Sequence, residues 1–173
     1  GKRMNAVVRQ SEPERASPST HADREAYLET IRLIERAHRR FLDVVKDELE
    51  RLDRTEINNV QAVLLHNVGE ETLTPSELKN RGYYLGSNVS YNLKKLGELG
   101  YLSQARSNHD RRTVRIQVTE KGVDIVRMVD GLLARHMRSL APIGGVQADG
   151  LAMASQTLRR LDRFWKDQVL YRL

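Results

Sequence analysis

The 173-residue sequence contains no cysteine, and this absence alone removes several classes of function. Without a thiol there is no disulfide, no cysteine-based zinc site, and no thiol catalysis or redox sensing. No apolar run approaches the roughly 18 residues that a membrane span needs, so we expect no membrane partner. The N-terminal residues 1–24 alternate charge, serine and proline, and do not look like a signal peptide. These absences favour a soluble protein of the reducing cytoplasm.

The sequence also lacks the patterns that accompany catalysis. No glycine-rich phosphate loop follows a predicted strand, and no nucleophile lies in a recognisable arrangement with a base. The five histidines are scattered along the chain without the spacing of metal ligands. We therefore expect neither an enzyme, nor a metal site, nor a cofactor.

What the sequence does have is positive charge concentrated in one stretch. The formal net charge is +6. Residues 79–115 include eight basic and only two acidic residues, and the rest of the chain is neutral overall. This stretch is either an ordinary solvated basic face or the surface that meets a polyphosphate partner.

Apolar periodicity predicts the longer helices and a hairpin. Residues 1–22 are polar and contain two prolines, so we expect a disordered arm there. Steps of three and four between apolar residues predict helices over 23–53, 55–68, 120–140 and 148–170. Thr55 is the expected N-cap of the helix over 55–68. Strict alternation over 113–118 predicts a half-buried strand, and with it a hairpin over 101–118 whose tip is at 107–112.

Two shorter helices are predicted between the second long helix and the hairpin. Thr74-Pro75-Ser76-Glu77 has the form of a capping box, in which Thr74 accepts from the N–H of Glu77 and Glu77 reaches back to the backbone of Thr74. This predicts a helix over 75–81. After a glycine turn, Ser87 is expected to cap a helix over 87–99, and Thr119 to cap the helix that follows the hairpin.

A short capped helix, a turn, a second helix with a polar outer face and a basic-tipped hairpin form the order of a winged helix-turn-helix. We expect a mainly α fold with a small β-hairpin wing. Residues 54–119 would form the DNA-binding lobe, and residues 23–53 with 120–173 a helical dimerisation region. Helix 87–99 would enter a major groove about 12 Å wide, with the wing in an adjacent minor groove. The helix residues expected at the bases and phosphates are Ser87, Asn88, Ser90, Tyr91, Lys94 and Lys95.

Three short stretches make the sequence resemble the MarR family of bacterial transcription regulators. They are Leu99-Gly100-Tyr101-Leu102, Asp110-Arg111-Arg112 and Val118-Thr119-Glu120-Lys121-Gly122. These look like the end of the family's recognition helix, its D-x-R wing and its L-T-x-x-G start of helix five, although Val118 stands where Leu is usual. The resemblance extends from about residue 23 to the end of the chain. Residues 83–91 are similar to an alphaproteobacterial branch that includes the LdtR-type regulators.

The resemblance implies double-stranded DNA as the partner and assigns roles in the wing. Arg112 would enter the minor groove, with Arg111 beside it, while Asp110 orients Arg112 and the wing tip. Plainer interpretations stay open: Asp110 and Arg112 could form a local ion pair worth about 0–1 kcal/mol if exposed. Tyr91 could pack onto the preceding helix, and the two lysines could be ordinary solvated charges. A protein-interaction module and an RNA-binding winged helix are the competing functions.

The terminal helices carry more apolar positions than a compact winged-helix core can bury. Since soluble proteins rarely keep large apolar patches exposed, we expect a homodimer in which these helices interlock, as the resemblance also implies. The alternative is an antiparallel bundle within one chain. Many relatives bind a small aromatic acid or phenol, and the residues that could line such a pocket here are His38, Phe41, Gln61 and Leu65. The alternative for Phe41 and Leu65 is a place in the core.

Overall fold

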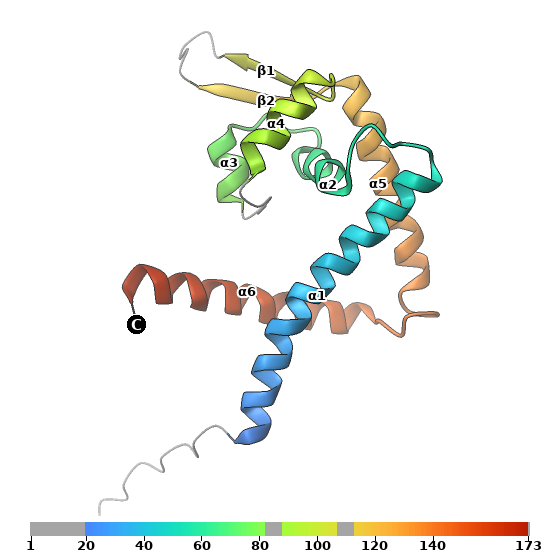
Figure 1. Ribbon diagram of the computed structural model, residues 1–173. Coiled ribbons are helices and arrows are strands. Elements are labelled where there is room, and N and C mark those ends of the chain that lie inside the picture. The colour runs from blue at the N-terminus through green and yellow to red at the C-terminus, as the bar shows by residue number, and fades with distance from the viewer. Residues whose placement is uncertain (1–19, 82–87, 107–112, 173) are drawn as a thin grey trace, which may run out of the picture. The chain divides into compact units, whose positions relative to one another are not determined.

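The computed structural model describes residues 20–81, 88–106 and 113–172, and its elements follow the predicted order (Figure 1). The elements are α1 (His21–Arg51), α2 (Asn59–Val68), α3 (Pro75–Asn80), α4 (Val89–Glu98), β1 (Leu102–Arg106), β2 (Val114–Val118), α5 (Glu120–Ser139) and α6 (Ala148–Tyr171). The predicted mainly helical fold with one β-hairpin is therefore confirmed. Across the described ranges, none of the helices combines the length and the apolar character that a membrane crossing requires.

The chain divides into two compact units, residues 1–44 and residues 45–173. In the first unit, the described part of α1 places Tyr27, Ile31 and Ile34 at exposed positions along the helix. The second unit holds the last turns of α1 and all the other elements.

The core of the second unit forms where α2 packs against α5. α2 is apolar around most of its circumference, while α5 contributes one stripe of buried residues at helical spacing. Fully burying one large aliphatic side chain stabilises a fold by about 1.5–3 kcal/mol. The most deeply buried side chains come from nearly every element of this unit and are Val45, Leu64, Leu65, Val68, Leu73, Leu78, Leu96, Ile116, Ile125 and Val129.

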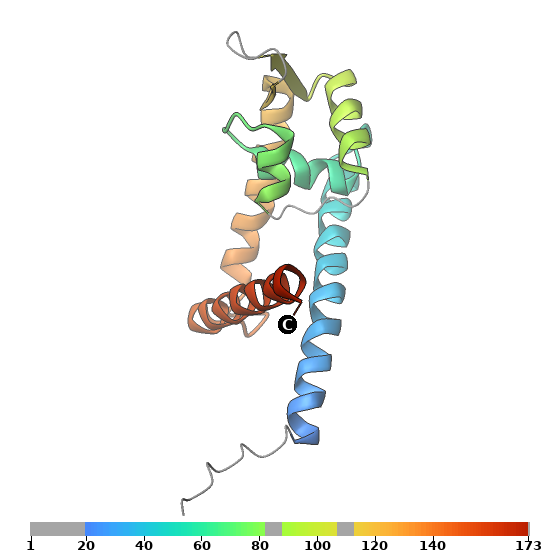
Figure 2. The ribbon, with the colours of Figure 1, turned by 90° about the vertical axis from the view of Figure 1, so that its left-hand side faces the viewer.

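The hairpin pairs β1 and β2 side by side (Figure 1), in antiparallel register with Leu102 opposite Val118 and Arg106 opposite Val114. Figure 2 shows the same hairpin nearly edge-on. The alternation predicted for the second strand is confirmed, because Ile116 is fully buried while its neighbours Arg115 and Gln117 are exposed. The structure also shows a short segment paired with the outer side of β2, which the sequence did not predict. Leu73, just before α3, exchanges two backbone hydrogen bonds with Ile116, at N···O distances of 3.0 and 2.6 Å. The segment that leads into α3 is therefore fixed to the wing.

The helix starts were predicted with mixed success. Thr119 caps α5 as expected, since its hydroxyl accepts from the N–H of Gly122 at 3.2 Å. The prediction of Thr55 as the cap of α2 was wrong: α2 begins at Asn59. Asn58 and Gln61 there form a full capping box, a pattern of amides in place of the expected threonine.

The predicted capping box of α3 is only partly formed. The hydroxyl of Thr74 accepts from the N–H of Glu77 at 3.1 Å, as expected. The carboxylate of Glu77 accepts from that same hydroxyl at 3.2 Å and not from the backbone N–H of Thr74. The start of α3 is still fixed, because Pro75 occupies its first turn.

The start of α5 is joined to the start of the wing by very close backbone packing. The N–H of Thr119 donates to the carbonyl oxygen of Tyr101 at 3.0 Å, and its hydroxyl donates to the carbonyl oxygen of Gly100 at 2.6 Å. A Cβ on Gly122 would lie 2.3 Å from the same Tyr101 oxygen and 2.6 Å from Cγ1 of Val118. Only glycine fits at position 122.

We expect Gly122→Ala to lower the free energy of unfolding by about 2–3 kcal/mol, because a methyl group there must displace backbone. Gly131→Ala in the same helix is the matched control, since a Cβ at Gly131 meets no atom within 4 Å. That control should raise the free energy of unfolding by about 0.5–1 kcal/mol. Urea denaturation followed by circular dichroism measures both. Equal effects of the two substitutions would contradict the close packing.

Candidate nucleic-acid interface

The two faces of α4 differ sharply in burial. Leu93 and Leu96 are buried on its inner face, while Ser90, Tyr91 and Lys94 are exposed on the other. The side chain of Tyr91 is 61% exposed, so packing onto the preceding helix does not account for it. α4 therefore presents an open polar face.

The ends of this face are less regular than the sequence predicted. Lys95 is half-buried, not fully exposed like Lys94. Asn88 is the N-cap residue of α4 and is exposed, but its side chain makes no capping hydrogen bond. Ser87, the predicted cap, lies outside the described residues. α4 begins at Val89, two residues later than predicted.

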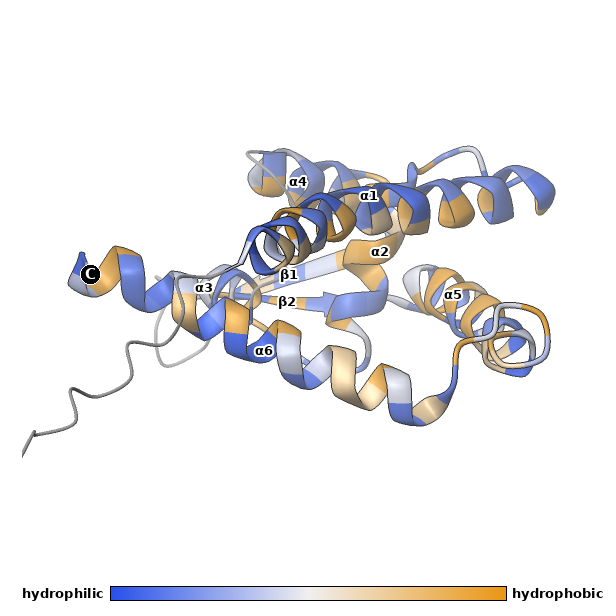
Figure 3. Ribbon diagram, turned by 90° about the horizontal axis from the view of Figure 1, so that it is seen from below, coloured by the Kyte–Doolittle hydropathy of each residue, from blue (hydrophilic) through white to orange (hydrophobic). Residues whose placement is uncertain are grey.

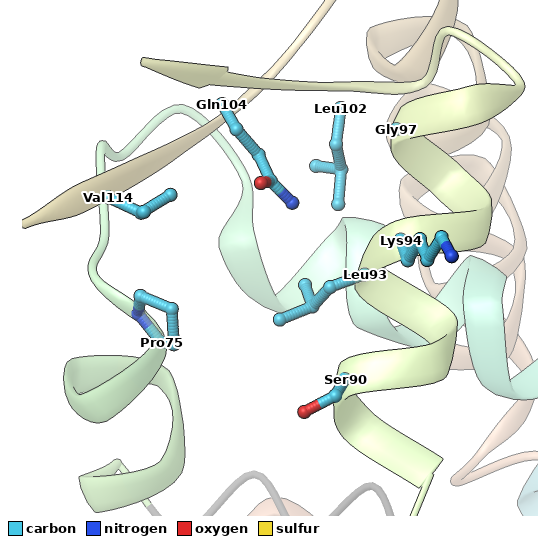
Figure 4. Close-up of a pocket in the computed structure, with 8 residues that line it drawn as sticks. All are labelled: Pro75, Ser90, Leu93, Lys94, Gly97, Leu102, Gln104 and Val114. Carbon is cyan, nitrogen blue, oxygen red and sulfur yellow. The ribbon is translucent and has the colours of Figure 1, made fainter. Parts of the chain in front are cut away.

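A groove of about 540 Å³ separates the outer part of α4 from the hairpin and the first residue of α3. Figure 4 shows the hydroxyl of Ser90 and the amide of Gln104 directed into this space, with Lys94 on the α4 side. Apolar side chains from each element form the rest of its wall. The complete lining is Pro75, Ser90, Leu93, Lys94, Gly97, Leu102, Gln104 and Val114. The sequence did not single out Gln104, although its place on an exposed strand position is a usable signal.

The two strands of the wing carry basic residues of their own. Arg106 and Val114 are the paired residues at the outer end of the two strands, so the tip begins and ends at adjacent points. The predicted tip residues Asp110, Arg111 and Arg112 lie outside the described residues. Arg115 is described, and it is exposed on β2.

A cluster of polar groups fastens the C-terminal end of α4. The ammonium group of Lys121 donates to the carbonyl oxygen of Leu99 at 2.8 Å and lies 3.2 Å from a carboxylate oxygen of Glu56. It also stands over the ring of Tyr101, 4.5 Å from the centroid. The Tyr101 hydroxyl donates to Glu56 at 2.5 Å. A cation beside the last carbonyl groups of a helix is favourable, because the helix dipole is negative there.

These contacts shift two pKa values in opposite directions. The hydrogen bond from Tyr101, and then that from Lys121, hold the pKa of the Glu56 carboxyl below its ordinary value. Burial first, and the neighbouring Glu56 second, raise the pKa of the Tyr101 phenol to about 12. Tyr101 therefore stays a neutral donor well into alkaline solution.

Asn92 is a buried polar residue on the inner face of α4, and sequence reasoning missed it. It is 6% exposed, and its Oδ1 accepts a hydrogen bond at 3.3 Å from Nε2 of Gln61, which is 5% exposed on α2. Gln61 was predicted as a pocket residue, and its side chain also completes the capping box of α2. The other predicted pocket residue of the second unit, Leu65, is fully buried in the core.

His38 and Phe41, the remaining predicted pocket residues, belong to the first compact unit. His38 is exposed and Phe41 is half-buried on α1. Within the described part of the chain, no three metal-ligating side chains gather in a way that could hold an ion. The pocket of these four residues stays a prediction.

Comparisons with known proteins agree with this geometry. Residues 57–122 match the family described as winged helix DNA-binding domain. The chain is 37% identical over 145 residues to the exopolysaccharide II synthesis transcriptional activator ExpG of Rhizobium meliloti, covering 84% of this chain and 74% of that protein.

Two solved structures with DNA have a similar fold. FabT of Streptococcus pneumoniae has a TM-score of 0.62 at 24% identity and covers 82% of this chain and 98% of that one. A mutant MarR of E. coli with operator DNA has a TM-score of 0.59 at 22% identity and covers 75% of this chain and 91% of that one.

The Tyr101 cluster predicts how stability depends on alkaline pH. The folded-state pKa of about 12 lies above the ordinary value of about 10. The folded state thus keeps a proton that the unfolded chain releases, so this contribution is present below pH 10 and is lost between about pH 10 and 12. Glu56→Gln keeps an acceptor but removes the charge, which should lower the pKa of Tyr101.

The measurement is the tyrosinate absorbance of each protein during alkaline titration, with Tyr101→Phe subtracted to isolate Tyr101. Glu70→Gln, at an exposed position before α3, is the control and should leave the titration of Tyr101 in place. An unchanged Tyr101 titration in Glu56→Gln would rule out the contact.

Proposed function

Because this chain belongs to the MarR family of winged-helix transcriptional regulators, we propose that it binds a pseudo-palindromic operator as a homodimer, with α4 in the major groove and the wing in the minor groove. It is a DNA-binding regulator and not an enzyme, as its relatives are regulators. A regulator of this kind acts on bacterial DNA in the cytoplasm.

The observation that carries this binding mode is the exposed polar face of α4 inside the basic stretch of the sequence. A helix with its side chains is about 10–12 Å across, which matches a major groove about 12 Å wide. Asn88, Ser90 and Tyr91 lie at the N-terminal end of that face, where short polar groups reach base edges. Lys94 and Lys95 follow one turn later and would meet phosphates. The predicted DNA contact of Ser87 lies outside the described residues.

The wing completes the interface in this proposal. Arg106 and Val114 are paired at the ends of the two strands, so both ends of the segment 107–112 start from the same point of the wing. A narrow minor groove has enhanced negative potential, which favours inserted arginine. Arg112, with Arg111, would occupy it while Asp110 orients the tip.

The exposed apolar residues of α6 support the homodimer. Figure 3 shows hydrophobic turns along this helix, and none of its described residues is buried. Leu158 is 43% and Phe164 is 52% exposed, although both are large apolar side chains. A monomer would leave these groups in water, whereas a second copy of α6 would cover them. Two-fold protein symmetry then requires an operator with two related half-sites, centred about one helical turn or 10 base pairs apart.

Family resemblance also suggests a response to a small aromatic acid or phenol. We propose that such a ligand would lower operator affinity. The residues predicted to line its pocket are His38 and Phe41 in the first unit and Gln61 and Leu65 in the second. The burial of Leu65 and the hydrogen bonds of Gln61 already give these two residues structural roles. Titration with salicylate, taken as the probe, tests the response, and an unchanged operator affinity would reject it for this class of acid.

The test of the binding mode is a salt titration on the duplex that the wild-type protein selects from a randomised library. Each phosphate contact contributes a slope of about −0.9 to log K against log salt. We expect Lys94→Ala to weaken binding to all duplexes and to flatten the slope by about two, one contact from each subunit. Lys46→Ala, an exposed lysine on α1, is the matched control and should leave the slope unchanged.

In the same titration Arg112→Ala should weaken sites with A·T flanks more than those with G·C flanks, because a minor-groove arginine reads groove width. Structured RNA serves as competitor. Unchanged affinity and slope in both the Lys94 and Arg112 variants would show that the binding mode is wrong. Preferential binding of the RNA would favour the RNA-binding alternative.

For the dimer we expect replacement of both Leu158 and Leu161 by aspartate to give a monomer or insoluble protein with weakened operator binding. Two charges placed on the apolar stripe would have to be buried without partners. Gln156→Asp, exposed on the same helix, is the control and should stay dimeric. Sedimentation velocity at micromolar concentration decides the question, and a wild-type monomer would contradict the proposal.

A further inference from the structure

We infer that Gln61 and Asn92 form a positioning pair that sets the rotation of α4, and so determines which bases the outer face of α4 reads. The inference rests on the proposed placement of α4 in the major groove. Neither residue is part of the exposed face, and neither would touch DNA. Their effect would be on the specificity of binding and not on its electrostatic strength.

The first step is the direction of the contact. Lys121 fastens the C-terminal end of α4 at Leu99. Along its inner face the other buried contacts of α4 are those of Leu93 and Leu96, and apolar packing has no preferred direction. A hydrogen bond does have one, because it weakens steeply outside a narrow range of distance and angle. The bond from Nε2 of Gln61 to Oδ1 of Asn92 therefore fixes a rotation that the leucines alone would leave soft.

The second step is that Gln61 is itself held in place. Its Oε1 accepts from the N–H of Asn58 at 3.0 Å, and its own N–H donates to Oδ1 of Asn58 at 2.8 Å. The carbonyl end of the side chain is thus committed to the start of α2, which leaves the amide end aimed at α4. Gln61 acts as a rigid link between the first turn of α2 and the middle of α4.

The third step is the burial of both partners. Gln61 is 5% and Asn92 is 6% exposed, so water cannot readily replace a broken bond. A buried amide without a partner is costly, and any rotation of α4 that separates the two groups carries that cost. The pair therefore resists turning of α4 in either direction.

The fourth step is geometric. Asn92 directly follows Tyr91 and precedes Lys94 by two residues, so it sits behind the centre of the exposed face. Since a helix with side chains is about 10–12 Å across, a rotation of about 20° would move an outer side-chain end by about 2 Å. A hydrogen bond to a base edge does not survive such a shift, whereas a salt-screened attraction to phosphates does.

The experiment compares binding to two probes: the duplex that the wild-type protein selects from a randomised library, and a shuffled duplex of the same composition. Asn92→Leu removes the acceptor at similar size and leaves the Gln61 amide without its partner. We expect the ratio of the two affinities to fall by about tenfold, which is toward the low end of the range for the loss of one base contact. Affinity for the shuffled duplex and its salt slope should stay close to wild type.

Two further variants separate positioning from a general loss of stability. Asn92→Asp keeps an oxygen that accepts from Gln61, so its affinity ratio should remain near the wild-type value even if its added charge weakens binding to both duplexes equally. Ile125→Val, in the core of α5, lowers the melting temperature modestly without touching the pair and should keep the ratio.

The inference is overturned if Asn92→Leu retains the wild-type affinity ratio, or if Ile125→Val loses it to the same extent. The failure of the proposed binding mode would look different, because Lys94→Ala would then leave affinity and salt slope unchanged. A folded Asn92→Leu protein with normal discrimination, together with a Lys94→Ala protein that binds weakly, would reject the positioning pair alone.

Discussion

The carbonyl oxygen of Tyr101 lies where α4 ends, the wing begins and α5 starts, and it constrains all three. It accepts from the N–H of Thr119, which returns the chain from the second strand of the wing to the point where the first strand left. The first turn of α5 approaches so closely that only glycine fits at position 122. Gly100, whose φ of +85° is left-handed, supplies the reversal after α4 that brings Tyr101 to this point.

This constraint explains why two separate stretches of the sequence carried the family resemblance. Residues 99–102 and 118–122 are distant along the chain but form one junction. The ammonium group of Lys121 donates a hydrogen bond to the carbonyl oxygen of Leu99, and the hydroxyl of Thr119 donates one to that of Gly100. Gly122 packs against the carbonyl oxygen of Tyr101. The orientation of the wing relative to α4 is fixed only if the first residues of β1 and the last residues of β2 are both held in place. These two motifs therefore encode the angle between α4 and the wing.

A second fastening joins the last turn of α1 to α5 and uses a buried charge. The carboxylate of Glu48 is 5% exposed and receives Arg51 at 2.6 Å and Arg135 at 2.7 Å. The hydrogen bond from Arg51, ahead of the contributions of Arg135, lowers the pKa of Glu48. A buried carboxylate is tolerated only when it is paired in this way. Within the second unit, Glu48 thus ties the last turn of α1 to α5 with a bond that has direction.

Sequence periodicity predicted the element order and most boundaries to within one or two residues, because amphipathic helices and an alternating strand leave direct signatures. Thr119 was predictable as a cap, since a hydroxyl at that position has one obvious use. The start of α2 was not predicted correctly. Asn58 and Gln61 form its capping box with amide side chains, whereas the hydroxyl of Thr55 resembles a more common kind of N-cap. The Leu73 bridge to Ile116 was also missed, because a single paired residue has no periodicity.

The same distinction holds at the candidate site. Some of its residues could be predicted from the pattern of one helix alone, and others only from the contact between two helices. The exposed positions of Ser90, Tyr91 and Lys94 followed from the helical repeat alone. Asn92 did not, because a polar residue on the inner face of a helix is meaningful only when its partner is known, and Gln61 lies 31 residues away. In the proposed binding mode, the basic stretch would attract any sequence of DNA equally. Discrimination among sequences would then need α4 to be held in one rotation, and the groups that can hold it are buried behind its exposed face.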